Sequence, residues 1–168
     1  MAEIIDNFLS KYQFESLEKD ILGTSFPWYF NRYATGKRYE DISQFTHTFY
    51  DNRSPWNGIG SPWYNIVEPF IIKLGAKKIY RIKANLNPRT FIHRNTGYHV
   101  DFKDNDPPHK TAVFYVDTNN GWTQFKKGGK VKSIANRIVI FDCDQVHAGF
   151  TATDQERRVL INFNFSDV

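Results

Sequence analysis

The stretch Tyr98-His99-Val100-Asp101 decides how the rest of this 168-residue sequence is interpreted. In an extended strand the side chains alternate between two faces, so His99 and Asp101 point to the same side. An imidazole and a carboxylate about 6–7 Å apart along one strand face can reach one metal ion. A second imidazole from a distant strand would complete a two-histidine, one-carboxylate site. Such a site leaves open coordination positions and is typical of non-haem iron(II) oxygenases.

Two later residues extend this pattern. His147 lies in a short segment that is interpreted as a strand, and a jelly roll can place that strand opposite His99. Arg158 lies in the apolar terminal segment, where alternation puts it on the same face as Asn162. A guanidinium group pairs with a carboxylate through two hydrogen bonds, so we expect Arg158 to bind the far carboxylate of 2-oxoglutarate. Arg157, on the opposite face, is the alternative anchor.

The composition indicates a folded, aromatic-rich chain. Hydrophobic residues make up 40% of the sequence and aromatic residues 17%, which argues against disorder. The net charge of +4 is compatible with an anionic cosubstrate but does not by itself indicate nucleic acid. The single cysteine, Cys143, excludes an internal disulfide and is expected to be a small buried residue. No signal peptide or membrane-length apolar run is found, so we expect a cytoplasmic protein without a membrane partner.

The hydrophobic periodicity predicts helices first and strands afterwards. Apolar residues at helical spacing predict helices over 4–24 and 62–75, and 25–64 is interpreted as aromatic-rich loops. The aromatic residues of these loops either serve function or pack over one end of a barrel. From residue 79 the period changes to two, with turn signals between short segments. The predicted strands are 79–86, 91–102, 111–116, 122–125, 131–134, 138–141, 147–150 and 159–165, with a proline-broken loop at 103–108. This order favours a sandwich or jelly roll with helices packed on one sheet.

From about residue 78 to 165 the sequence resembles Fe(II)/2-oxoglutarate-dependent oxygenases, nearest their prolyl-4-hydroxylase-like branch. The matching segments are 98–102, 112–116, 120–123, 137–141, 147–149 and 158–163. The whole chain, including 26–30, is similar to small single-domain members encoded by tailed bacteriophages, for which the compartment would be the host cytoplasm. The resemblance implies one domain, 1–168, that is mainly β with N-terminal helices. Residues 1–76 would support a double-stranded β-helix, a jelly-roll or cupin-like barrel, at 77–168.

The resemblance also implies a site. It assigns His99, Asp101 and His147 as ligands of Fe(II), with 2-oxoglutarate and O2 as cosubstrates and ascorbate as a stimulant. The positions that match cosubstrate contacts are Arg158, Tyr115, Thr123 and Asn85. The other histidines, His47, His93 and His109, are expected to be ordinary packed or exposed residues. Two departures are Asn120-Gly121 in place of Gly-Gly, and Arg158 where collagen-type prolyl hydroxylases use lysine. The second departure favours bacterial or protein-directed types.

The expected function is hydroxylation of a substrate C–H bond, with a prolyl residue of a peptide or protein as the candidate and a small molecule still open. The chain is expected to act as a monomer or homodimer. One alternative is a non-catalytic cupin-like module that binds a metal or ligand. Another is a nucleic-acid-directed oxygenase, which would use basic residues at the expected mouth of the barrel. These residues are Arg89, Arg94, Lys103, Lys110, Lys126 and Lys127, and they fit a solvated rim equally well.

Overall fold

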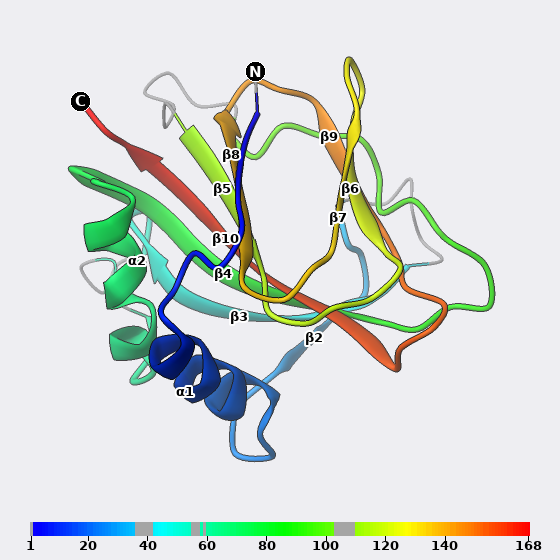
Figure 1. Cartoon of the computed structure of the whole chain (residues 1–168), viewed down its shortest axis with the longest axis horizontal. Coiled ribbons are helices and arrows are strands. Elements are labelled where there is room, and N and C mark those ends of the chain that lie inside the picture. The colour runs from blue at the N-terminus through cyan, green and yellow to red at the C-terminus, as the bar shows by residue number, and fades with distance from the viewer. Residues whose placement is uncertain (1, 36–41, 55–57, 59, 103–109) are drawn as a thin grey trace.

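The computed structural model describes residues 2–35, 42–54, 58, 60–102 and 110–168 (Figure 1). The predicted loop at 103–108 lies outside these ranges, as does His109. The helices are α1 (Lys11–Leu22), the 3₁₀ helix η2 (Tyr64–Ile66) and α2 (Glu68–Lys73). The strands are β1 (Glu3–Ile5), β2 (Tyr29–Asn31), β3 (Gln44–Asp51), β4 (Lys78–Pro88), β5 (Lys110–Tyr115), β6 (Trp122–Phe125), β7 (Lys130–Lys132), β8 (Arg137–Asp142), β9 (His147–Phe150) and β10 (Arg157–Ser166).

Two antiparallel sheets face each other. The large sheet has the strand order β1-β8-β5-β10-β4-β3-β2, and the small sheet has the order β7-β6-β9 (Figure 1). From β5 onwards the chain passes back and forth between the sheets, which is the winding of a jelly roll. The predicted strands from 79 to 165 are confirmed to within a few residues, with the exception of 91–102.

The segment 91–102 is not a continuous strand, and this part of the prediction was wrong. It extends the small sheet only through two isolated bridges, from Asn95 to Phe150 and from His99 to His147. Gly97 lies between these bridges with φ of +103°, a conformation that interrupts an extended backbone. His99 and Asp101 nevertheless point into the same cavity, as the alternation argument expected.

The hydrophobic core lies on both faces of the large sheet. In β10, Val159, Ile161 and Phe163 point outward and pack with α1 and α2. Leu160 points inward and packs with side chains of the small sheet, in a second and smaller cluster. The predicted division of this strand into an apolar face and a face that carries Arg158 is therefore confirmed. Among the described residues, no helix is long and apolar enough to cross a membrane.

The first helix is shorter than the predicted range of 4–24. Residues 3–5 form β1, which pairs with β8, because Ile4 and Ile5 can extend the large sheet at its edge. The helix begins only after Ser10, whose hydroxyl caps the backbone N–H of Gln13, while the Gln13 side chain accepts from the Ser10 backbone N–H. The predicted stop at Gly23 is confirmed, since Gly23 is the C-terminal cap.

The interpretation of 25–64 as loops was wrong for residues 29–31 and 44–51, which form β2 and β3. β3 is an eight-residue strand of the large sheet, paired with β4 on one side and with the short β2 on the other. Its aromatic and threonine side chains suit a pleated surface, and this signal was present in the sequence. Phe26, Phe49 and Trp63 pack together in the outer core. Ordinary packing therefore accounts for these three aromatic side chains.

The predicted second helix, 62–75, consists of η2 followed by α2. Phe70 of α2 anchors this region, since its ring centroid lies 4.8 Å from those of Phe114 and Phe163 in the large sheet. These contacts fix the sheet whose inner face carries the candidate site.

Asn136→Ala is expected to lower the free energy of unfolding by about 2–3 kcal/mol. The Asn136 side chain accepts from the Leu9 N–H at 2.8 Å and donates to the Leu9 carbonyl at 2.9 Å, which ties the N-terminal segment to β8. Asn136 also has φ of +60°, which alanine tolerates poorly. Asn136→Gly removes the hydrogen bonds but tolerates this φ, so we expect a smaller loss. Urea unfolding measures both variants, and equal stability of Asn136→Ala and wild type would contradict the expectation.

Candidate active site

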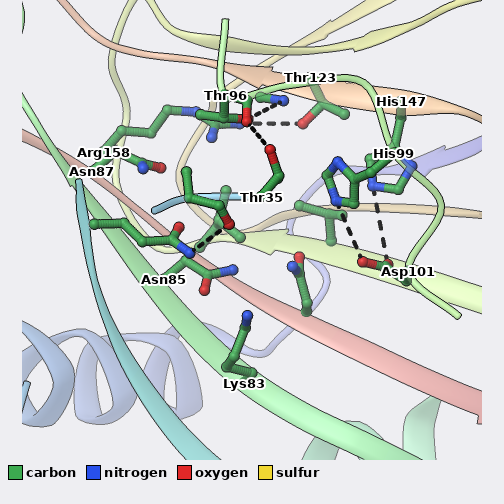
Figure 2. A pocket seen from close by; sticks show the side chains of 16 residues that line it. Thr35, Lys83, Asn85, Asn87, Thr96, His99, Asp101, Thr123, His147 and Arg158 are labelled. Carbon is green, nitrogen blue, oxygen red and sulfur yellow. Dashed lines mark hydrogen bonds and ion pairs between the residues drawn. The ribbon is translucent and has the colours of Figure 1, made fainter. Parts of the chain in front are cut away.

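Three side chains with metal-binding atoms meet in a cavity lined by both sheets. His99, Asp101 and His147 each offer one ligand atom, and these atoms all lie within 4.8 Å of one another. His99 Nε2 lies 3.6 Å from Asp101 Oδ1, and His147 Nε2 lies 4.0 Å from Asp101 Oδ2 (Figure 2). Two imidazole nitrogens and one carboxylate oxygen form a donor set that suits iron(II) and other first-row divalent metals.

The backbone aligns the two imidazoles. His99 and His147 exchange backbone hydrogen bonds of 2.9 and 3.0 Å, so their side chains emerge side by side from one antiparallel pair. Each Nδ1 also donates to a nearby carbonyl, of Gly97 in one case and of Gln145 in the other. Because Nδ1 is held by a carbonyl oxygen in both cases, Nε2 is the ring atom of each histidine that faces Asp101 and is available to a metal ion.

The Asp101 carboxylate is buried and ionised. Thr111 and Asn164 donate to Oδ2 at 3.2 and 3.1 Å, and Arg81 approaches Oδ1 at 3.5 Å. Burial alone would raise the pKa of Asp101, but the hydrogen bond to His99 and the charges of His147 and Arg81 hold it well below its usual range. The negative charge that a divalent cation requires is therefore present before any metal arrives.

Arg158 is a fully buried cation of the same cavity. Its side chain is 1% exposed, and it donates to Ser133 Oγ at 2.8 Å and to Thr123 Oγ1 at 3.2 Å. No carboxylate of the described residues lies within ion-pair distance of its guanidinium group. Burial lowers the pKa of Arg158, but arginine stays charged in proteins. A buried and unpaired guanidinium group is costly unless an anion completes the site.

Glycine makes room for this arginine. A Cβ atom at Gly121 would lie 2.7 Å from Arg158 Cδ and 2.7 Å from the Phe150 carbonyl oxygen. A Cβ atom at Gly149 would lie 3.3 Å from Arg158 Nη1. The arginine therefore passes through a gap that only glycine leaves open at position 121. Of the Asn120-Gly121 pair, the glycine is the residue that matters here.

Gly121→Ala is expected to lower affinity for 2-oxoglutarate, the ligand expected for Arg158, by about tenfold. The added methyl group displaces the arginine or the neighbouring backbone, because the 2.7 Å contacts cannot be kept. Calorimetric titration of the zinc-loaded protein measures the change. Gly129→Ala is the matched control, since a Cβ atom there meets nothing within 4 Å. An equal loss of 2-oxoglutarate affinity in both variants, or no loss in Gly121→Ala, would contradict the idea that Gly121 leaves the space that Arg158 needs.

The remaining predicted positions lie around Arg158. Asn85 and Thr123 line the cavity, and Tyr115 does not. The Tyr115 hydroxyl donates to Thr123 at 2.8 Å, and the centre of the Tyr115 ring lies 5.6 Å from the Arg158 guanidinium carbon. Tyr115 therefore packs against the arginine from outside the cavity. Arg157 is absent from the described lining of the cavity. Of the two candidate anchors for 2-oxoglutarate, Arg158 lines the cavity and Arg157 does not.

Sequence reasoning missed part of the cavity wall. Lys83 and Asn87 of β4 line the cavity beside Asn85 (Figure 2). The signal was present in the sequence, because these polar residues alternate with Ile82, Ala84 and Leu86 along a period-two segment. Thr96, which lines the cavity, and Ser133, which accepts from Arg158, were also missed, and nothing in their local sequence marks them. Asn85 Oδ1 and Asn87 Nδ2 are buried without a partner among the described residues, which leaves them available to a ligand.

The other histidines that the structure describes have partners elsewhere. His47 packs against Phe26 and bonds to the Pro27 carbonyl and to Ser61. His93 bonds to the Thr151 carbonyl. Neither lines the cavity.

The residues of the predicted basic rim do not line this cavity in the described part of the chain. Lys110 pairs with Asp142 at 2.7 Å, and Lys126 and Lys127 line a different hollow. Lys103 lies outside the described residues. Cys143 is half-buried rather than fully buried as expected.

The fold is shared with solved structures of 2-oxoglutarate-dependent Fe(II) oxygenases. No family model matches the sequence, and no curated protein matches it. A prolyl hydroxylase from Trichoplax adhaerens, in complex with a hypoxia inducible factor oxygen degradation domain peptide fragment, is 14% identical with a TM-score of 0.62, covering 99% of this chain and 84% of that one. A 2OG-Fe(II) oxygenase family oxidoreductase from Burkholderia pseudomallei is 12% identical with a TM-score of 0.64, covering 98% and 87%.

A third similar structure is a non-haem α-ketoglutarate-dependent epimerase from nogalamycin biosynthesis, where α-ketoglutarate is 2-oxoglutarate. It is 11% identical with a TM-score of 0.59, covering 96% of this chain and 76% of that one. At these identities the likeness establishes the jelly-roll fold of such oxygenases. The chemistry of this chain has to be argued from its own residues.

Proposed function

We propose that the chain is an Fe(II)- and 2-oxoglutarate-dependent oxygenase that hydroxylates a substrate C–H bond. The observation that carries this proposal is one cavity that holds both the cluster of His99, Asp101 and His147 and the unpaired guanidinium group of Arg158. A metal site alone would not require a second, cationic end. A dicarboxylate that binds metal at one end and arginine at the other fits both ends.

The residues fit the metal. Two Nε2 atoms with fixed orientation and one ionised carboxylate are the donors that iron(II) takes in a facial triad. The Nδ1 contacts to backbone carbonyls are the outer bonds that commonly orient metal-binding histidines. We therefore assign His99, Asp101 and His147 as the residues that would hold iron(II). When bound, iron(II) supplies, with 2-oxoglutarate and dioxygen, the oxidant for hydroxylation, and succinate and carbon dioxide are the coproducts.

The side chains of the cavity would bind and orient 2-oxoglutarate and the substrate. Arg158 would pair with the far carboxylate of 2-oxoglutarate, while Ser133 and Thr123 keep its guanidinium group in place. Tyr115 supports Thr123 through its hydroxyl group. Asn85 would contact the cosubstrate through its amide nitrogen, or a donor group of the substrate through its unpaired oxygen. The protein thus positions the reactants and excludes water, and the metal and cosubstrate carry the oxidation.

A prolyl residue in a peptide or protein is the first substrate to test. Two lines support this choice: the resemblance of the sequence to the prolyl-4-hydroxylase-like branch, and the shared fold of a prolyl hydroxylase that binds a peptide. The shared fold of an epimerase shows that related chains use the same cosubstrate for other outcomes. The proposal for the reaction therefore stands independently of the substrate.

The test is iron-dependent conversion of 2-oxoglutarate to succinate, followed by NMR, with prolyl peptides and with fractions of a cell lysate. Succinate should form only with iron(II) and dioxygen, and mass spectrometry should find a product heavier by one oxygen atom. The zinc-loaded protein is the control, since zinc has no redox chemistry. Failure of the wild-type protein to bind 2-oxoglutarate in the presence of zinc, together with no succinate in any fraction, would refute the proposal.

The cupin-like alternative is less well supported. A module that binds a metal structurally has no need of a cationic pocket beside it, and burying Arg158 unpaired lowers stability. That alternative predicts metal binding without affinity for 2-oxoglutarate. The calorimetric titration named above separates the two functions directly.

A further inference from the structure

Lys83 is a second cation that lines the cavity, and it lies farther along the β4–β10 pair than Arg158 does. Lys83 lies in the middle of β4, and its backbone is paired with Asn162 of β10 and Thr48 of β3. Arg158 is paired with Asn87 on the same two strands. Lys83 and Arg158 thus occupy separate positions, four residues apart in register. Figure 2 shows the Lys83 side chain rising from β4 into the cavity, on the side of Asp101 rather than of Arg158.

This ammonium group has no partner of its own. Lys83 makes no hydrogen bond, ion pair or cation–π contact with any described residue, although it lines the cavity. Burial, with a smaller contribution from Arg81, lowers the pKa of Lys83 to about 8. A lysine held in this way lowers stability unless a ligand compensates. It is therefore a candidate for ligand binding rather than for support of the fold.

The wall around Lys83 is polar. Asn85 lies two residues after Lys83 on the same face of β4, and Asn162 of β10 is paired directly with Lys83. Asn85 Oδ1 and Asn162 Oδ1 are both buried without a hydrogen-bond partner among the described residues. Buried amides normally find partners, and an amide oxygen only accepts, so these two oxygens beside an unpaired ammonium group indicate a polar ligand that also carries a hydrogen-bond donor, such as the ammonium group of an amino acid.

The charges of the cavity leave room for one more anion. The charged side chains of its described lining are Lys83, Asp101 and Arg158, which together give one net positive charge if the histidines are neutral. Iron(II) and the dianion of 2-oxoglutarate cancel each other. One positive charge therefore remains in a largely buried site after metal and cosubstrate have bound. A substrate with a negative charge near Lys83 would neutralise it.

We propose that Lys83 is a second anion site that holds a carboxylate of the substrate, which favours a small carboxylic acid such as a free amino acid over the internal prolyl residue named above as the first substrate to test. This inference rests on the proposed oxygenase function and specifies its substrate class. An internal peptidyl residue has no carboxylate on its backbone and would leave Lys83 unpaired. The other possible source of a carboxylate here is the metal-side end of 2-oxoglutarate itself.

The experiment uses zinc-loaded protein saturated with 2-oxoglutarate, titrated with acetate as the probe and with acetamide as its neutral counterpart. Wild-type protein should bind acetate and not acetamide, as followed by NMR shifts of the lysine side chain and neighbouring amides. Lys83→Met should weaken acetate binding by at least about tenfold, the value of one charge-assisted hydrogen bond. Lys83→Arg should retain binding, and Lys126→Met, which removes a lysine from a different hollow, should leave it unchanged.

Three outcomes would overturn the proposal: no binding of acetate to wild type, equal binding of acetate and acetamide, or equal acetate affinity in Lys83→Met. A tenfold or greater loss of 2-oxoglutarate affinity in Lys83→Met would also overturn it, because the lysine would then belong to the cosubstrate. Lys83→Met should also raise the melting temperature, since it removes a desolvated charge. If wild type fails to bind 2-oxoglutarate, the proposed function fails, and acetate titration of the zinc-loaded protein still tests Lys83 alone.

Discussion

Arg158→Met is expected to lower the affinity of the zinc-loaded protein for 2-oxoglutarate by at least about a hundredfold. The variant removes a buried guanidinium group that has no carboxylate partner among the described residues and that Ser133 and Thr123 hold in position. The carboxylate of the ligand would then be buried against neutral groups, which costs several kcal/mol. Methionine fills a similar volume, so the fold should survive. Calorimetric titration measures the affinity, and thermal unfolding checks the fold.

Two further variants make this result specific. Arg157→Met removes the adjacent arginine, which does not line the cavity, and should leave the affinity within about threefold of wild type. Arg158→Lys keeps the charge but loses the planar pair of donors, so an intermediate loss is expected. A large effect of Arg157→Met with little effect of Arg158→Met would show that the anchor had been assigned to the wrong arginine.

Asp101→Asn is expected to lower affinity for zinc or manganese(II) by more than about a hundredfold. The substitution keeps the shape of the side chain and an oxygen that can accept from Thr111 and Asn164. It removes the only anionic ligand of the cluster and leaves the Arg81 charge without its partner. Metal affinity is measured by calorimetry on protein freed of metal with a chelator.

The control for this variant is Asp142→Asn, which also removes a carboxylate from an ion pair, at the surface with Lys110. Metal affinity should not change in the control, and stability should change by less than about 1 kcal/mol. If Asp101→Asn binds metal as wild type does, the three residues do not form the metal centre. If it unfolds, His147→Gln provides the same test from β9.

Much of the site could be predicted because strand alternation is a local rule. In β10 the apolar positions Val159, Ile161 and Phe163 identify the face that packs on the helices, which assigns Arg158 to the other face without knowledge of its neighbours. The same rule applied to β4 would have found Lys83 and Asn87. In β4, Lys83, Asn85 and Asn87 share one face, and Ile82, Ala84 and Leu86 share the other.

Other parts could not be derived from local pattern. The contact between Ser133 and Arg158 joins a loop residue to a strand 25 positions later, and only the winding of the barrel brings them together. The chain around His99 follows no regular strand, since Gly97 breaks it, so its two bridges to β9 are a tertiary result. β3 could not be predicted for a different reason, because it is followed closely by glycine, serine and proline residues, which are typical of loops.

The alternation in β10 also has a consequence for how this chain can change over generations. One strand carries the outer core on its odd positions and Arg158 on an even one, and its neighbour β4 carries Lys83 and Asn85 in fixed register with it. Deletion or insertion of a single residue would exchange these faces, and would bury the arginine among the helices while turning phenylalanines into the cavity. Sequence drift in these two strands should therefore proceed by substitution, and length variation should be confined to the turns. A library of single-residue deletions, scored for soluble protein and for binding of 2-oxoglutarate, should lose both properties together throughout β4 and β10.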